Sequence, residues 1–445
     1  MIDSKRLRFD FLPIVFVLIF AAFLRIPAFY LSHNNVDEDA YLSLAMKLDK
    51  YGLNDYAKNF NLHFIDFLDN EHFRAPVIGD RSIGDMLLRL KVNYERGMPT
   101  HRPPVFSLLL MASHRIFASH GYYASSSTEG NPYWHLQFYA TIIPFLFSLL
   151  SIFFTYILGK MLFDERIGLY AALFLSLTPV ELLAAHKIWA ETALVFFTIL
   201  TAIFYFLSVK SIRQGRIIYA LLCGISAGIA FLTKFTGAFI VPAIMLHHLW
   251  LNRQKLKSAG SLFGVFFDVR IVLVILTAVA ISFPWLCALH KSFGLNNMPK
   301  ILTTASSATP WLASLGQRPW YMYIINTPCQ FPIYFLGYAA IFVFFKKHRD
   351  DNRQFFLIAW FMLTLIFLSF FLWCKDDRYM LPAYPAIAIL SSLVLGRVEK
   401  VLNNKSHLSG YVISSLLIIL TAVIAFDLVI PDIVMRKDLL LFAFL

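Results

Sequence analysis

Charged residues are scarce in this chain. Only 15% of its 445 residues are Asp, Glu, Lys or Arg, whereas soluble domains carry roughly a quarter. Hydrophobic residues reach 58%, and phenylalanine alone occurs 45 times. This composition excludes a soluble globule and a disordered chain. A length that would otherwise suggest two or three soluble domains therefore indicates a polytopic membrane protein.

Cysteine is also rare, and its spacing carries no metal or disulfide signature. The four cysteines form no CxxC pair and no Cys/His pattern typical of zinc sites. All of them lie in or beside apolar segments, so we expect free thiols in the membrane. They are Cys223, Cys287, Cys329 and Cys374.

Apolar runs predict an all-α protein with about eleven membrane spans, because a helix needs about 20 residues to cross a hydrocarbon core of about 30 Å. The first run is followed by Arg25-Ile26-Pro27 rather than a small-residue cleavage site, so we interpret it as an uncleaved span. The spans centre on residues 11–29, 136–158, 167–183, 192–209, 217–232, 235–251, 271–289, 321–345, 355–373, 380–396 and 410–430.

The distribution of basic residues predicts the orientation. With the N-terminus inside, the inner loops hold nineteen Lys and Arg and the short outer loops hold seven. Basic residues concentrate in cytoplasmic loops, so this asymmetry supports the topology. It also explains the formal net charge of +12 without a nucleic-acid partner. If residues 103–118 formed a further span, every later basic loop would move to the outside and the asymmetry would invert. We therefore expect an interfacial helix there.

Polar sequence is concentrated on the predicted outer side. A large loop of interfacial helices over residues 30–134 contains twelve of the 27 acidic residues, and a second outer loop covers 291–320. No internal repeat is visible. We predict one membrane module over residues 1–396, followed by a last span and a short tail over 397–445. The chemistry should therefore face outward, beside the membrane.

An acidic cluster follows the first span. Asp37-Glu38-Asp39 precedes apolar residues at the i, i+3, i+4 and i+7 spacing of an amphipathic helix, beginning at Tyr41. Acids in a first helical turn commonly cap free N–H groups and favour the helix dipole. The alternative is a carboxylate base at headgroup depth, where a lipid-linked substrate presents its polar end.

Other charged residues occur at predicted outer ends of spans. They are His101 and Arg102 before two prolines, Glu191, Lys234 in a tight turn and Arg378. Each cation could be an interface anchor, but a glutamate so close to an apolar run is costly unless it is paired or hydrated. Together these positions suit anionic-lipid chemistry, in which cations hold a phosphate and a carboxylate accepts a proton.

At these residues the chain resembles the C-superfamily of glycosyltransferases (GT-C), in particular the protein O-mannosyltransferase and aminoarabinose transferase branch. The resemblance runs from about residue 10 to about residue 396. In order, the matching features are DExxY at Asp37, Glu38 and Tyr41, a basic residue before Pro-Pro at Arg102, LTP at Leu177–Pro179 leading to Glu191, GIAFLTK ending at Lys234, and RYMLPAYP from Arg378 to Pro385.

The resemblance implies a transferase with a polyprenyl-phosphate sugar donor. It implies Asp37 as the principal catalytic carboxylate, Glu191 as the second, and Arg102 at the donor phosphate, with Lys234 and Arg378 as further phosphate-binding candidates. Glu38, Tyr41 and His101 would support the site. The chain departs from the pattern at Ala40, where aminoarabinose transferases carry an arginine, and at His101, where they carry a glutamate that contacts a metal. We therefore assign no metal site and no cofactor, although a divalent cation stays open for a pyrophosphate-linked donor.

The predicted reaction is one inverting displacement. A sugar on a lipid phosphate already has a good leaving group, so the protein must deprotonate an acceptor hydroxyl and stabilise the departing phosphate. Membrane lipid and the lipid-linked donor are the expected partners, and the acceptor is not identified. The expected location is a bacterial inner membrane, with the site on its periplasmic face. A secondary transporter and a lipid-linked oligosaccharide ligase or polymerase stay as alternatives.

Overall fold

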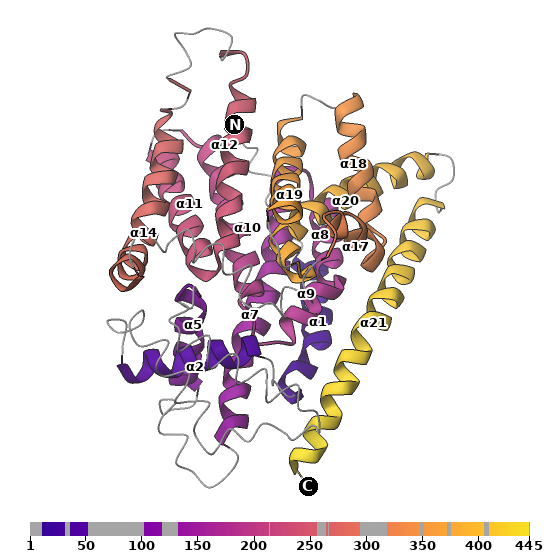
Figure 1. The fold of residues 1–445 in the computed structure, drawn as a ribbon. Coiled ribbons are helices and arrows are strands. Elements are labelled where there is room, and N and C mark those ends of the chain that lie inside the picture. The colour runs from indigo at the N-terminus through magenta and orange to yellow at the C-terminus, as the bar shows by residue number, and fades with distance from the viewer. Residues whose placement is uncertain are drawn as a thin grey trace.

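The computed structural model describes residues 11–31, 36–51, 102–117, 132–212, 214–255, 264–265, 267–293, 318–347, 351–371, 375–404 and 409–444. Every regular element within these ranges is helical, which confirms the predicted all-α fold. Most helices stand side by side as a bundle, and α2 (Val36–Tyr51) lies across one end of it (Figure 1).

Eight of the described helices are long and apolar enough to cross a membrane, so the chain is a multi-pass membrane protein. Within lipid, each backbone N–H and C=O must find a partner in its own segment, which makes these apolar runs helical. The eight are α1 (Phe11–Arg25) with η2 (Ile26–Tyr30), α7 (Pro132–Leu162), α10 (Glu191–Lys210), α11 (Gln214–Thr233), α14 (Val269–Phe293), α19 (Asn352–Phe370), η6 (Asp377–Ala383) with α20 (Tyr384–Asn403), and α21 (Ser409–Phe444).

The predicted count of eleven spans is not confirmed, because three predicted spans are interrupted. The span over 167–183 is a bent pair, α8 (Glu165–Leu177) and α9 (Pro179–Ala185), which meet at 64° and could count as a ninth span. The span over 235–251 divides into a 3-10 helix, η3 (Phe235–Phe239), and α12 (Ile240–Leu251). The span over 321–345 divides into α17 (Met322–Gln330) and α18 (Tyr334–Lys347). Hydropathy averaged over a window does not detect such breaks.

The predicted amphipathic helix after the first span is confirmed as α2. Its apolar positions Tyr41, Leu44, Ala45 and Leu48 are all buried. Against α2 and α7 packs α5 (Val105–Phe117), whose 13 residues reach only about 20 Å at 1.5 Å per residue. It is therefore too short to span a bilayer, in agreement with the prediction for residues 103–118.

Parts of the sequence predictions fall outside the described residues. Residues 52–101 and 118–131 of the first predicted outer loop, and 294–317 of the second, are among them. The division at residue 396 stays a prediction, and α20 continues past it to Asn403. Cys223, Cys287 and Cys329 are free thiols as expected, and Cys374 is not described.

Candidate active site

Five charged side chains from five separate elements meet around the first turn of α2. Asp37 lies in that turn, Arg102 precedes α5, Glu191 begins α10, Lys234 follows α11, and Arg378 lies in η6. These are the residues for which the sequence predicts catalytic or phosphate-binding roles. The fold brings all five together.

Two arginines hold the Asp37 carboxylate. The Arg102 guanidinium contacts Asp37 Oδ1 through Nη2 and donates from Nη1 to the Asp37 carbonyl at 3.0 Å. The Arg378 Nη2 donates to Asp37 Oδ2 at 2.5 Å. Both carboxylate oxygens therefore accept from guanidinium groups, an arrangement that goes beyond the helix-capping role that the sequence also allowed.

The second carboxylate, Glu191, is almost fully buried and is also paired. Its Oε1 accepts from Lys234 Nζ at 2.5 Å and lies 3.6 Å from Arg378 Nε. Arg378 thus stands between the two predicted catalytic carboxylates. The pairing with Lys234 satisfies the electrostatic requirement of a buried glutamate at the end of a membrane helix.

The position of Lys234 depends on a sharp turn. Lys234 is extended, with φ −160° and ψ 141°, between the end of α11 and η3. Its carbonyl accepts from the Gly237 N–H at 2.9 Å. A Cβ on Gly237 would lie 2.4 Å from the Ala230 carbonyl oxygen, so this close return of the chain requires glycine.

Each of the three cations also lies over an aromatic ring. The Arg102 guanidinium is 4.5 Å from the Tyr41 ring centroid, Arg378 is 4.2 Å from Trp189, and the Lys234 ammonium is 4.6 Å from Tyr379.

Cation–π contacts of this kind contribute about 0.5–1 kcal/mol at exposed sites and more when they are desolvated. They fix the direction of each cation without using its N–H hydrogen-bond donors.

The arginines determine the protonation of Asp37. Burial raises the pKa of the Asp37 carboxyl, but the charges of Arg102 and Arg378 outweigh burial and hold the pKa well below its usual range. Asp37 is therefore ionised, yet it is a weak base while both arginines remain bound to it. Efficient proton transfer needs a pKa nearer to the working pH.

The predicted supporting residues have structural partners. Glu38 is buried, and its Oε1 accepts from the Ile188 N–H at 2.9 Å, so it links α2 to the loop before α10. The Tyr41 ring packs edge-on against Phe106 at 4.9 Å between centroids. Burial raises the pKa of the Tyr41 phenol, which keeps the hydroxyl protonated. His101 lies outside the described residues.

Three neighbours of Arg378 are not among the predicted site residues. Asp376 Oδ2 lies 3.1 Å from Arg378 Nε, and the rings of Trp189 and Tyr379 flank the guanidinium. Trp189 and Asp376 stand two residues from predicted positions, so proximity in sequence is the signal that could have found them.

With Asp376 included, the cluster contains three carboxylates and three cations. Within the described ranges, no group of three or more His, Cys, Asp or Glu side chains is placed to hold a metal ion. The arrangement is suited to exchanging carboxylate–arginine pairs for phosphate–arginine pairs.

Comparison with known sequences supports the predicted resemblance. A family model described as dolichyl-phosphate-mannose-protein mannosyltransferase matches residues 134–285. The undecaprenyl phosphate-alpha-4-amino-4-deoxy-L-arabinose arabinosyl transferase 2 of Proteus mirabilis is 25% identical over 263 residues, which cover 57% of this chain and 44% of that protein. The chain thus spans less than half the length of this curated relative.

Solved structures share the fold. ArnT from Cupriavidus metallidurans bound to undecaprenyl phosphate aligns with a TM-score of 0.58 at 15% identity, over 87% of this chain and 61% of that one. The archaeal oligosaccharyltransferase AglB from Archaeoglobus fulgidus, in complex with an inhibitory peptide and a dolichol-phosphate, aligns with a TM-score of 0.53 at 14% identity, over 96% and 56% of the two chains. The predicted resemblance to the GT-C superfamily is confirmed, and the chain has its fold.

Proposed function

We propose that this chain, which has the GT-C fold, is a membrane glycosyltransferase that moves a sugar from a polyprenyl-phosphate donor to an acceptor hydroxyl. The observation that carries the proposal is the Asp37 carboxylate clamped by Arg102 and Arg378. A donor phosphate can take over both guanidinium groups, because arginine binds carboxylate and phosphate with the same planar fork. The similar proteins are named as arabinosyl and mannosyl transferases, which supports the same reaction class.

Donor binding would activate the base. When the phosphate engages Arg102 and Arg378, Asp37 loses the positive charges that hold its pKa down. Its pKa then rises, because burial favours the neutral form. The carboxylate becomes a competent base only when the donor is present, which couples proton transfer to donor binding.

The displacement itself balances in atoms and charge. The acceptor oxygen forms a bond to the anomeric carbon, and the bond between that carbon and the phosphate oxygen breaks with its electron pair on the phosphate. The acceptor proton goes to Asp37. The phosphate gains a negative charge as Asp37 loses one, so the fixed cations stabilise the leaving group without net change in the charge of the site. One such step inverts the anomeric centre.

Glu191 would have a different role from Asp37 in this scheme. It is nearly buried and is held by Lys234 at 2.5 Å, so it is less available to the acceptor than the partly exposed Asp37. It would keep Lys234 and Arg378 charged and oriented toward the phosphate. This is a narrower role than that of the second catalytic carboxylate, which the resemblance implied for Glu191.

The finer location is also part of the proposal. The nineteen-to-seven distribution of basic residues in the predicted loops supports an outward-facing site. The relatives are bacterial proteins, so the proposed membrane is a bacterial cytoplasmic membrane, with the outward-facing site on its periplasmic face. A polyprenyl-phosphate sugar, whose lipid tail is anchored in that membrane, would reach the cluster at headgroup depth.

Purified protein in nanodiscs tests the function with a panel of radiolabelled polyprenyl-phosphate sugars and an extract of membrane lipids as acceptor. We expect label to enter an acceptor while polyprenyl phosphate is released, and Asp37→Asn to slow this transfer about 10²–10⁴-fold. Movement of the intact donor across a vesicle bilayer without release of phosphate would instead indicate a transporter. Use of pyrophosphate-linked glycans alone would indicate a ligase or polymerase.

A further inference from the structure

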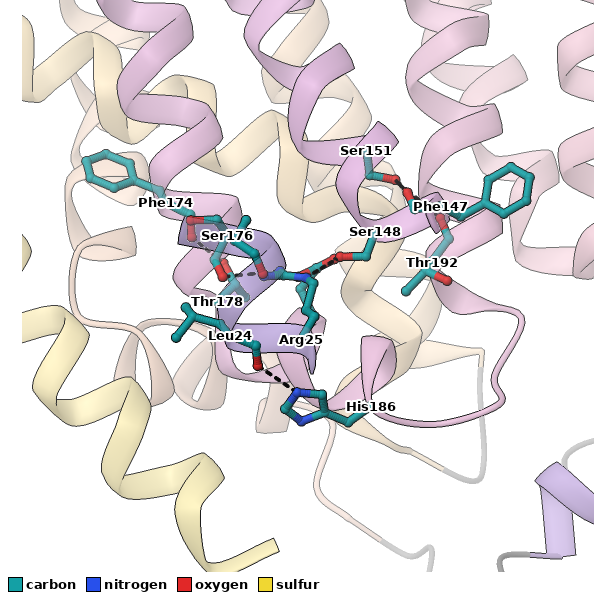
Figure 2. A network of polar contacts seen from close by, with 12 residues as sticks. Leu24, Arg25, Phe147, Ser148, Ser151, Phe174, Ser176, Thr178, His186 and Thr192 are labelled. Atoms are coloured by element: carbon teal, nitrogen blue, oxygen red, sulfur yellow. Dashed lines mark hydrogen bonds and ion pairs between the residues drawn. The ribbon is translucent and has the colours of Figure 1, made fainter. Parts of the chain in front are cut away.

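A second charged network lies inside the bundle, away from the cluster around Asp37. The Arg25 side chain at the end of α1 is fully buried and forms an ion pair with Glu181 of α9, which is 1% exposed. Ser148 of α7 joins them: its Oγ accepts from Arg25 Nε at 2.5 Å and donates to Glu181 Oε1 at 2.5 Å. Figure 2 shows Arg25 reaching Ser148 and Ser176, and the Leu24 carbonyl meeting His186.

Arg25 also satisfies backbone groups. Its Nη1 donates to the Ala21 carbonyl at 2.9 Å, and its Nη2 donates to the Ser176 carbonyl at 3.2 Å. Ser176 belongs to the last turn of α8, directly before the 64° break. Pro179 begins α9 and has no N–H to continue the helix. Arg25 thus compensates part of the hydrogen bonding that the broken span loses.

Such an ion pair is unusual in a membrane span. Removing two charges from water is costly, and their attraction offsets that cost only when the geometry is good and the remaining donors are satisfied. An apolar pair would hold the helices together at lower cost. A positional role for Arg25 and Glu181 explains why charges are used here.

The ion pair is connected to the active-site cluster by ten residues of chain. Beyond α9, His186 Nε2 lies 2.9 Å from the Leu24 carbonyl, adjacent to Arg25. The loop then presents the Ile188 N–H to Glu38 and the Trp189 ring to Arg378. Glu191 follows as the first residue of α10. The end of α1 therefore holds the segment that contacts Glu38 and Arg378 and leads to Glu191.

We propose that Arg25 and Glu181 are positioning residues, which fix the bend between α8 and α9 so that the loop 186–190 holds Trp189 and Glu191 against Arg378. The expected effect of this pair on turnover rests on the proposed transferase function. Its expected effect on the position of the loop does not rest on that function. Loss of the pair would leave the phosphate-binding residues present while misaligning Arg378. A misplacement of about 1 Å at a reacting centre can cost on the order of 100-fold in rate.

The test compares Arg25→Met/Glu181→Met with the wild-type protein in nanodiscs. Replacing both partners by apolar side chains avoids an unpaired buried charge and commonly preserves the fold. We expect the thermal unfolding temperature to stay near that of the wild type, kcat to fall about 10- to 100-fold, and donor KM to rise, because Arg378 is also a donor-phosphate residue. Amide hydrogen exchange in a peptide covering 186–190 should accelerate, because the Ile188 N–H loses its fixed partner.

The matched control is Arg166→Met/Glu399→Met. This pair also joins a fully buried glutamate to an arginine, between α8 and α20, and has no contact with the active-site cluster. We expect native turnover and native exchange in residues 186–190. Equal losses of activity in both double variants would overturn the proposal, because a general effect of removing an ion pair with a buried glutamate would then explain them.

Two further results decide the remaining cases. If the double methionine variant does not fold, Arg25→Lys takes its place in the test. Lysine retains the charge but replaces the guanidinium fork by a single nitrogen, so we expect faster exchange in residues 186–190 of a folded protein. Native exchange and native turnover in a folded Arg25 variant would overturn the positioning role. If the wild-type protein transfers no sugar, the proposed function fails, while the exchange measurement still tests the anchoring of the loop.

Discussion

Replacing Asp37 by asparagine should lower turnover and tighten donor binding at the same time. Asparagine has nearly the same shape but cannot accept the proton, and loss of a general base costs about 10²–10⁴ in rate. That corresponds to about 2.7–5.4 kcal/mol of transition-state stabilisation. The tighter binding follows from the structure, because Asp37 occupies the two arginines that the phosphate would need.

The size of the binding effect follows from the contacts of Asp37. A hydrogen bond to a charged group contributes about 1.5–3 kcal/mol. The asparagine carbonyl still accepts from one arginine, so about one such bond ceases to compete with the phosphate. The Asp37 and Arg102 side chains are 29% and 19% exposed, and solvent screening reduces the effect. We expect a gain of about 1 kcal/mol, or roughly fivefold in Kd.

The assay measures two quantities on the same preparation. Equilibrium binding of radiolabelled undecaprenyl phosphate to protein in nanodiscs reports the affinity, and single-turnover sugar transfer reports the chemical step. Asp49→Asn is the matched control, because Asp49 also lies on α2 and pairs with Arg115 of α5 at 2.5 Å. It should change neither quantity.

A folded Asp37→Asn protein with weaker donor binding would refute the competition between Asp37 and phosphate. Transfer near the wild-type rate would remove Asp37 from the role of base. If Asp37→Asn loses both activity and folded protein, the Asp37 ion pairs are structural. Loss of folded protein in the Asp49→Asn control as well would show that ion pairs between α2 and α5 are structural in general.

Two other predictions follow from the same contacts, and a third follows from the distribution of basic residues. Arg102→Ala should lose roughly 10- to 150-fold in turnover per folded molecule, from about 1.5–3 kcal/mol for its charge-assisted bond, whereas Arg102→Lys should be partly active; unchanged turnover in both would make Arg102 an anchor. Because its pKa in the fold lies below the value of about 3.9 in the unfolded chain, Asp37 stabilises the protein above pH 4 and loses this contribution as the pH falls further. The difference in unfolding temperature between wild type and Asp37→Asn should therefore shrink below about pH 4, and a constant difference would contradict the lowered pKa. A cysteine at Asn61 should react with an impermeant maleimide in intact cells, and one at Gln254 should not; the reverse pattern would invert the topology.

The sequence alone determines the class of protein and much of its layout. Composition and apolar runs are sufficient for a polytopic helical membrane protein, because a bilayer allows few other backbone arrangements. The helical spacing of the apolar residues and the acidic cluster before them identify the helix that begins near Asp37, and its apolar face is buried as predicted. The residue types and order from Asp37 to Arg378 also identify the five charged members of the cluster.

The span count shows where sequence reasoning stops. Hydropathy reports how apolar a stretch is, but a break such as the one between α8 and α9 depends on partners from elsewhere in the chain. Arg25 and Glu181, 156 residues apart in sequence, form an ion pair beside that break. Glu181 lies inside a predicted span, where nothing in the local pattern indicates its partner.

The tertiary structure alone decides which charges neutralise one another. The sequence places Asp37 and Arg378 at the same face of the membrane, but their 341-residue separation carries no information about their contact. A membrane span constrains the depth of a residue along the bilayer normal and leaves its neighbours in the plane of the membrane undetermined. Helix packing settles those neighbours, and with them the ionisation of Asp37 and the position of Arg378 between two carboxylates.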